Sequence, residues 1–143
     1  MDDCVETCIR VRYAETDQMG VVYYANYLVY FEVGRSDFCR QHGLSYDEIE
    51  RKTGSYLTVA EVHCRYLRPL RYDQEFVVRT FVKELRKRTV TFSYQLVDPA
   101  GGTIFAVGET LHVVTDGHGR PKTFPEGYRD FFAGRMKPPL PQG

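Results

Sequence analysis

The sequence lacks tryptophan and any excess of one charge: 19 basic and 19 acidic side chains give 143 residues a formal net charge of zero. Without a field of one sign, the chain has no general attraction for nucleic acid or for an anionic membrane surface. No stretch approaches the ~18 apolar residues of a membrane-spanning helix. The acidic start also lacks the apolar run of a signal peptide, so we expect a cytoplasmic protein with no membrane span and no nucleic-acid partner.

The cysteines also lack the spacing of a functional motif. Four are present, with no C-x-x-C pair and no metal-like cluster with the four histidines: Cys4, Cys8, Cys39 and Cys64. We therefore predict free thiols, no metal and no cofactor. Aromatic residues are plentiful instead, and a hydrophobic share of 43% suffices for one packed domain. The prediction is a single domain over residues 1–135, followed by a Pro-rich tail over 136–143.

Strand and helix patterns follow one another along the chain. Residues 5–13 alternate as a strand, and aromatic residues recur at helical spacing from Asn26 until Gly43. A short second helix runs to about Lys52. Four β-rich segments follow at 57–66, 75–85, 88–97 and 103–114. Their short connections predict antiparallel pairing, and one long helix covers only one face of such a sheet. The other face or an edge is therefore expected to meet a second subunit.

Asp17 stands where the first strand gives way to the long helix. Gly20 permits a turn just after it. A carboxylate there lies beside the unpaired N–H groups of a helix start, which would stabilise an oxygen that gains negative charge. Asp in such a loop is also a common cap or turn former. The residues alone leave both roles open.

Three motifs together resemble one family. They are Asp17-x-x-Gly20-Val21-Val22-Tyr23-x-x-x-Tyr27, Tyr66-x-x-Pro69-x-x-Tyr72-Asp73 and Glu84-Leu85-Arg86-Lys87-Arg88. The chain is similar over nearly its whole domain to the hotdog-fold acyl-CoA thioesterases of the 4-hydroxybenzoyl-CoA thioesterase type. This resemblance implies an α+β hotdog fold, in which an antiparallel sheet wraps around the long helix. It also implies an acyl-CoA substrate and a homodimer or homotetramer with active sites at the subunit interface.

The resemblance also implies site residues. Asp17 matches the catalytic carboxylate, which acts either as general base on water or as nucleophile through a mixed anhydride. A backbone N–H near Tyr24 matches the group that polarises the thioester carbonyl. The implied substrate-binding residues are Gly20, Val22, Tyr23, Tyr27, Arg86, Lys87 and Arg88. The last three would hold the phosphates of coenzyme A, ahead of a second basic group formed by Arg65, Arg68 and Arg71.

Two other functions stay open at this point. A non-catalytic acyl-CoA-binding module would share the fold. A hotdog enoyl-CoA hydratase or dehydratase would use a histidine with an acidic partner, for which His63 is the candidate.

Residues around the proposed site have simpler expected roles. Glu15 is expected to be solvated in the loop, and Glu32 to be exposed on the helix. Asn26 is expected to cap the helix, with orientation of a water as the alternative. Tyr30 and Phe31 are expected in the core.

Overall fold

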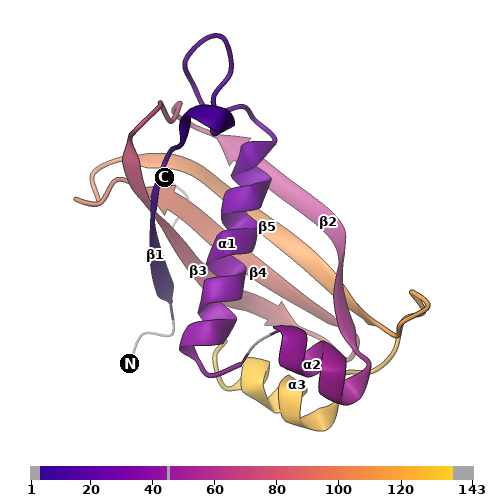
Figure 1. Ribbon diagram of the computed structural model, residues 1–143. Coiled ribbons are helices and arrows are strands. Elements are labelled where there is room, and N and C mark those ends of the chain that lie inside the picture. Colours follow the sequence, from indigo (N-terminus) through magenta and orange to yellow (C-terminus); the bar gives the residue numbers. More distant parts are fainter. Residues whose placement is uncertain (1–3, 45, 137–143) are drawn as a thin grey trace.

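One antiparallel sheet and one long helix make up most of the computed structural model, which describes residues 4–44 and 46–136. In the part of the chain described, the sheet has the strand order β1-β3-β4-β5-β2. The strands are β1 (Val5–Arg10), β2 (Tyr56–Tyr66), β3 (Glu75–Leu85), β4 (Thr89–Val97) and β5 (Ile104–Thr115). The helices are α1 (Asn26–Gln41), α2 (Tyr46–Thr53) and α3 (Glu126–Ala133). Figure 1 shows α1 along one face of the sheet, which confirms the predicted α+β fold.

Two elements differ from the sequence prediction. Strand β1 ends at Arg10, because Tyr13–Glu15 form a 3-10 turn instead of continuing the strand. Helix α3 was not predicted, because it follows Pro125 with no side-chain cap, whereas the equally short α2 follows the capping-box sequence Ser45-Tyr46-Asp47-Glu48. After it, Met136 forms an isolated bridge with Val82, whereas residues 137–143 of the predicted tail lie outside the described residues.

Helix α1 packs closely on the sheet through one buried face. Its inward side chains recur every three or four residues and are buried: Tyr27, Tyr30, Phe31 and Phe38. Gly34 lies on the same side, and a Cβ there would come within 2.5 Å of Thr80 Oγ1 and 2.6 Å of Val78 Cγ1. The helix can therefore approach β3 closely only because this residue has no side chain. The predicted core positions of Tyr30 and Phe31 are confirmed.

The two ends of the sheet are far apart. Arg10 pairs with Glu75, so the chain leaves β1 beside the start of β3. The hairpin tip between β3 and β4 lies at the other end of the 11-residue β3. Such a strand spans roughly 35 Å at about 3.3 Å per residue. We call the first end the cleft end and the second, where α2 and α3 pack in Figure 1, the closed end.

The remaining general predictions concern thiols and membranes. In residues 4–44 and 46–136, none of the four cysteine thiols is joined in a disulfide. Within the described ranges, no helix has both the length and the apolar character needed to cross a membrane.

Candidate active site

Asp17 sits in a tight hairpin at the cleft end, in the loop that protrudes beyond α1 in Figure 1. Its N–H donates to the carbonyl of Val21 at 2.9 Å, and Gly20 N–H donates to the carbonyl of Asp17 at 3.0 Å. Gly20 has φ +77°, a conformation that suits glycine, so its expected turn-forming role is met. One Asp17 oxygen, Oδ1, accepts from Met19 N–H at 2.8 Å. The side chain thus helps to form the turn and still lines a cleft.

The cleft brings together four of the predicted site residues. It has a volume of about 360 Å³ and is lined by Asp17, Val21, Val22, Tyr24, Tyr27, Tyr66, Leu67, Arg68 and Pro69. Gly20 and Tyr23 lie beside it without lining it, and the Tyr23 ring packs on Tyr24 with centroids 4.7 Å apart. Of the lining from Tyr66 to Pro69, only Arg68 was considered from the sequence, in the second basic group, and the other three residues were missed, although the motif Tyr66-x-x-Pro69 marked them.

Two backbone N–H groups just before α1 have no acceptor in the described residues, and one of them belongs to Tyr24, which lines the cleft. The carbonyl of Tyr23 accepts from Asn26 N–H at 2.9 Å, and the carbonyl of Tyr24 accepts from Tyr27 N–H at 3.3 Å. No residue in the described ranges accepts from the backbone N–H of Tyr24 or of Ala25. Such donors at a helix start carry partial positive charge and suit an oxyanion.

Two of the three tyrosines that line the cleft pack against each other. Tyr27 and Tyr66 meet edge to face with ring centroids 4.8 Å apart. The Tyr66 hydroxyl donates to the carbonyl of Tyr24 at 3.1 Å. Burial raises the pKa of Tyr27, and burial together with the Cys64 thiol raises the pKa of Tyr66 to about 12. Both side chains are neutral at physiological pH, and their rings give this part of the cleft lining an apolar character.

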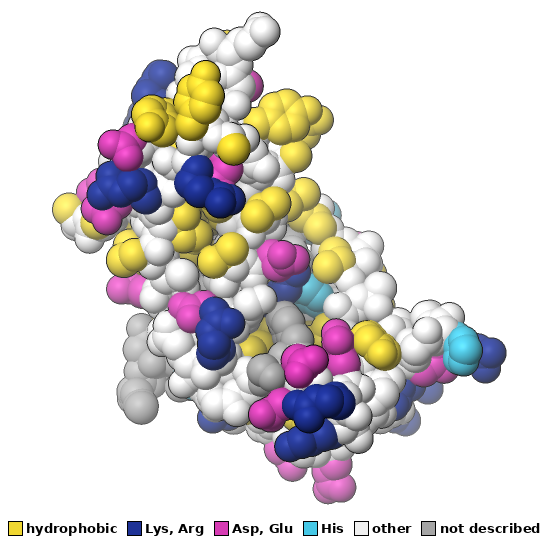
Figure 2. All heavy atoms as spheres, in the orientation of Figure 1, with side chains coloured by type: hydrophobic (Ala, Val, Ile, Leu, Met, Phe, Trp, Pro, Cys, Tyr) yellow, Lys and Arg dark blue, Asp and Glu magenta, His cyan; other side chains and the backbone are white. Residues whose placement is uncertain are grey.

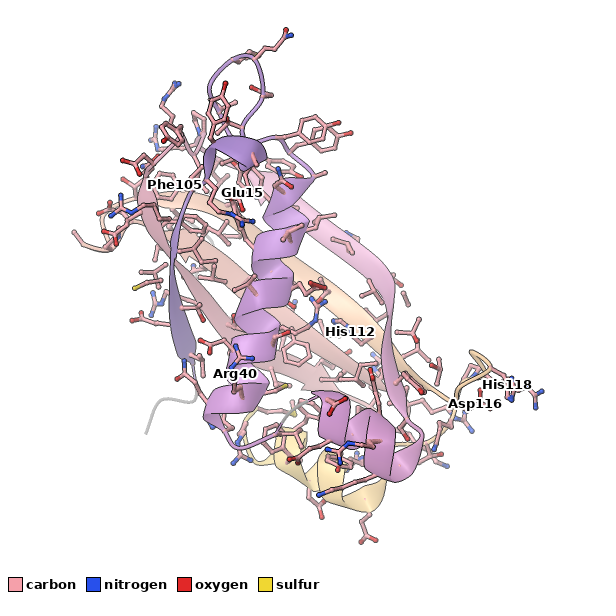
Figure 3. The ribbon with its side chains drawn as sticks, viewed as in Figure 1. Glu15, Arg40, Phe105, His112, Asp116 and His118 are labelled. Carbon is pink, nitrogen blue, oxygen red and sulfur yellow. The ribbon has the colours of Figure 1, made fainter. Side chains whose placement is uncertain are left out.

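The expectation that Glu15 is solvated is wrong. It is only 8% exposed, and Figure 3 places it between the end of β1 and the start of α1. Its carboxylate accepts from Arg12 N–H at 2.9 Å, from Arg12 Nε at 3.0 Å and from the Tyr30 hydroxyl at 2.8 Å. Burial by itself would raise the pKa of Glu15, but these hydrogen bonds lower it overall. Glu32 is exposed, as expected.

The basic hairpin is not part of the same cleft within one chain. Arg86, Lys87 and Arg88 are exposed at the closed end, opposite Asp17. Arg68, from the basic group that the resemblance ranked second, lines the cleft instead. Phosphate binding by the hairpin stays a prediction.

His63 is also separate from the cleft. Its side chain is exposed, with Nε2 3.4 Å from Glu61 Oε1. It lines a different depression, together with Cys64 and Glu109. In residues 4–44 and 46–136, no three His, Cys, Asp or Glu side chains gather as metal ligands would.

Comparison with known proteins decides the family. Residues 11–132 match the model of the thioesterase-like superfamily. The chain belongs to this superfamily. The Bacillus subtilis protein YneP is 42% identical over 93 residues, which cover 65% of this chain and 67% of that protein. The acyl-CoA thioester hydrolase YbgC of Escherichia coli is 29% identical over 108 residues, covering 76% of this chain and 79% of YbgC.

Solved structures of the superfamily share the fold. A hypothetical protein from Thermus thermophilus superposes with a TM-score of 0.86 at 36% identity, covering 92% of this chain and 98% of that one. The DHNA-CoA thioesterase from Staphylococcus aureus gives a TM-score of 0.82 at 28% identity, covering 96% of this chain and 99% of that one. The predicted hotdog fold, family resemblance and enzyme class of thioester hydrolase are confirmed.

Proposed function

We propose that the protein is an acyl-CoA thioesterase, which hydrolyses a coenzyme A thioester to a free acid and coenzyme A. One observation carries the proposal: a single cleft holds the Asp17 carboxylate, aromatic walls and the residue whose backbone N–H has no acceptor, Tyr24. The names of YbgC and of the Staphylococcus aureus enzyme support a coenzyme A thioester as the substrate class.

Asp17 and the helix start divide the chemistry between them. The Tyr24 N–H would donate to the thioester oxygen and stabilise the negative charge that develops there. Asp17 would either take a proton from the attacking water or attack the carbonyl carbon itself to give a mixed anhydride, which water then hydrolyses. The coenzyme A thiolate leaves without a general acid, because a thiol with pKa near ~8.5 is a good leaving group.

A second copy of the chain would cover the β2 edge. In the described sheet β2 pairs only with β5, and its exposed Val59 and Val62 face a groove of about 220 Å³ shared with Leu28 and Val29 of α1. On the face shown in Figure 2, hydrophobic side chains gather over the cleft end and along α1, whereas charged ones predominate over α2. A long unpaired apolar edge of this kind invites pairing with an identical edge.

Two-fold pairing of β2 edges would also bring the basic hairpin of each copy close to the cleft of the other copy. Antiparallel β2 strands would set the Tyr56 end of one copy beside the Tyr66 end of the other. Tyr56 pairs with Thr115 at the closed end, where the carbonyl of Arg88 accepts from Val114 N–H at 2.9 Å. The hairpin of one copy would thus approach the cleft of the other and hold the phosphates, with Arg68 at the rim. This arrangement would place the active sites at the interface of a homodimer, on its own or within a homotetramer.

Release of free coenzyme A from a panel of aliphatic and aromatic acyl-CoA thioesters tests the function. We expect turnover by the wild type. For Asp17→Asn we expect a kcat at least about 100-fold lower, since general-base catalysis contributes at least that much. Asp116→Asn is a matched control, because Asp116 also accepts backbone N–H groups in an exposed turn, from His118 at 2.8 Å and Arg120 at 3.0 Å. Near-normal kcat in Asp17→Asn rules out the assigned role.

The same panel separates the other readings. Tight acyl-CoA binding without release of coenzyme A would indicate a binding module, and hydration of an enoyl-CoA would indicate a hydratase. Light scattering of the purified protein tests the dimer or tetramer, and cell fractionation tests the predicted cytoplasmic location.

A further inference from the structure

The backbone carbonyl of Glu15 joins the segment before the Asp17 hairpin to the segment after it. This carbonyl accepts from Tyr23 N–H at 2.9 Å and from Asn26 Nδ2 at 2.9 Å. Glu15, two residues before Asp17, is therefore hydrogen-bonded to Tyr23 and Asn26, which lie one residue before and two residues after Tyr24. The separation between Asp17 and the Tyr24 N–H depends directly on these two hydrogen bonds.

The Glu15 side chain anchors the same point to the body of the helix. Tyr30, which is 1% exposed, lies one helical turn after Asn26 on the same face of α1 and donates its hydroxyl to Glu15 Oε1 at 2.8 Å. Arg12, two residues after β1, also holds the carboxylate, with Nη2 2.9 Å from Oε2. Strand β1, the Asp17 hairpin and α1 thus converge on one buried residue (Figure 3).

Asn26 does not act as the expected helix cap. The residue at the cap position is Ala25, which makes no side-chain capping bond. The Asn26 amide instead donates across to a carbonyl 11 residues earlier. Neither Asn26 nor Glu15 lines the cleft. Their hydrogen bonds can therefore affect the site only through the positions of Asp17 and the Tyr24 N–H.

We propose that Asn26 and Glu15 are positioning residues, whose hydrogen bond sets the gap across which Asp17 and the Tyr24 N–H act on one thioester carbonyl. The proposal rests on the function proposed above. Its physical basis is that a carboxylate and an oxyanion donor must meet the same carbonyl, and that a misplacement of about 1 Å can cost ~100-fold in rate.

Asn26→Asp is the sharpest variant. It keeps the size and shape of the side chain, but a carboxylate has no proton to donate to the Glu15 carbonyl. Asp at a helix start is as favourable for the helix as Asn, so α1 itself is not weakened, and a hydrogen bond that only stabilises the fold predicts a lower Tm with unchanged kinetics. A positioning role predicts a kcat at least about tenfold lower with KM within about twofold, because binding groups stay in place while the reacting groups separate. An unchanged kcat overturns the proposal.

A second pair of variants decides the point if Asn26→Asp does not fold. Glu15→Gln keeps an oxygen that can accept from Tyr30, whereas Glu15→Ala removes it. We expect kcat within about threefold of wild type for Glu15→Gln and at least about tenfold lower for Glu15→Ala, with both Tm values recorded. Equal kcat in the two variants overturns the proposal.

Thr7→Val is the matched control. The Thr7 hydroxyl donates to Asp37 Oδ2 at 2.6 Å and joins β1 to α1 away from the cleft. We expect this variant to lower Tm without lowering kcat. Asp17→Asn, assayed in parallel, separates the two claims: a full loss there together with normal kcat in Asn26→Asp contradicts only the positioning role.

Discussion

The two ends of the sheet carry aromatic clusters of different chemistry. At the cleft end tyrosines meet one another, as Tyr27 and Tyr66 do at 4.8 Å. At the closed end phenylalanines do so, with the Phe92 and Phe132 rings 5.8 Å apart and both fully buried. A phenylalanine can be sealed in a core without a partner, whereas a tyrosine hydroxyl needs a hydrogen bond or water. The closed end thus contributes mainly to stability, and the cleft end keeps polar groups available for a ligand.

Truncation at each end should separate these roles most strongly. Phe92→Ala leaves a cavity in the closed end, and we expect about 3–5 kcal/mol less stability. Tyr24 is 62% exposed, so Tyr24→Ala should change stability by less than about 0.5 kcal/mol while altering the kinetics. Denaturant unfolding and coenzyme A release, measured on both variants, check this. Equal losses of stability would remove the distinction between the ends.

The buried His112 should make stability depend on pH. Burial, followed by the nearby Arg35, lowers its pKa to about 3. Between pH 6.5 and 3 the unfolded chain binds a proton here that the folded chain does not, so stability falls as pH falls. We expect a loss of about 2 kcal/mol between pH 6.5 and 5.

Denaturant midpoints at several pH values test the role of His112. His112→Gln should flatten this part of the pH profile, whereas His118→Gln, in the exposed β5 loop labelled in Figure 3, should leave it unchanged. A wild-type profile that stays flat over this range contradicts the prediction.

Basic residues from both ends should contribute to substrate binding. Arg68→Ala and Arg88→Ala should each raise KM about five- to tenfold with kcat little changed, because phosphate contacts are kept from ground state to transition state. Steady-state kinetics in low salt measure the effect. If only Arg68→Ala raises KM, the hairpin of a second copy does not reach the cleft.

Removing one hydroxyl at the cleft end should have the smallest effect. Tyr66→Phe loses the hydrogen bond to the carbonyl of Tyr24 and keeps the ring against Tyr27. We expect about 0.5–1 kcal/mol less stability and a modest fall in kcat/KM. Tyr72→Phe, on an exposed ring outside the cleft, is the control and should match the wild type.

Much of the fold was predictable because its signals are local. The aromatic spacing from Tyr27 to Phe38 predicted α1, and the β-rich segments gave four strands to within one residue at each end. The eight-residue α3 was missed because, unlike α2 of the same length, it has no capping sequence and gains its stability from packing on the closed end. The prediction for Glu15 failed for a related reason: its partner Tyr30 lies 15 residues away.

The sequence by itself determined the antiparallel sheet, the long helix and the turn at Asp17, since periodicity and glycine act through neighbouring residues. Only the tertiary structure showed that Arg68 shares a cleft with Asp17 while Arg88 lies at the far end of the sheet. Strand pairing and helix packing join residues distant in the chain, and these long-range contacts decide which groups meet. Tyr24, Tyr66 and Arg68 reach one cleft for that reason.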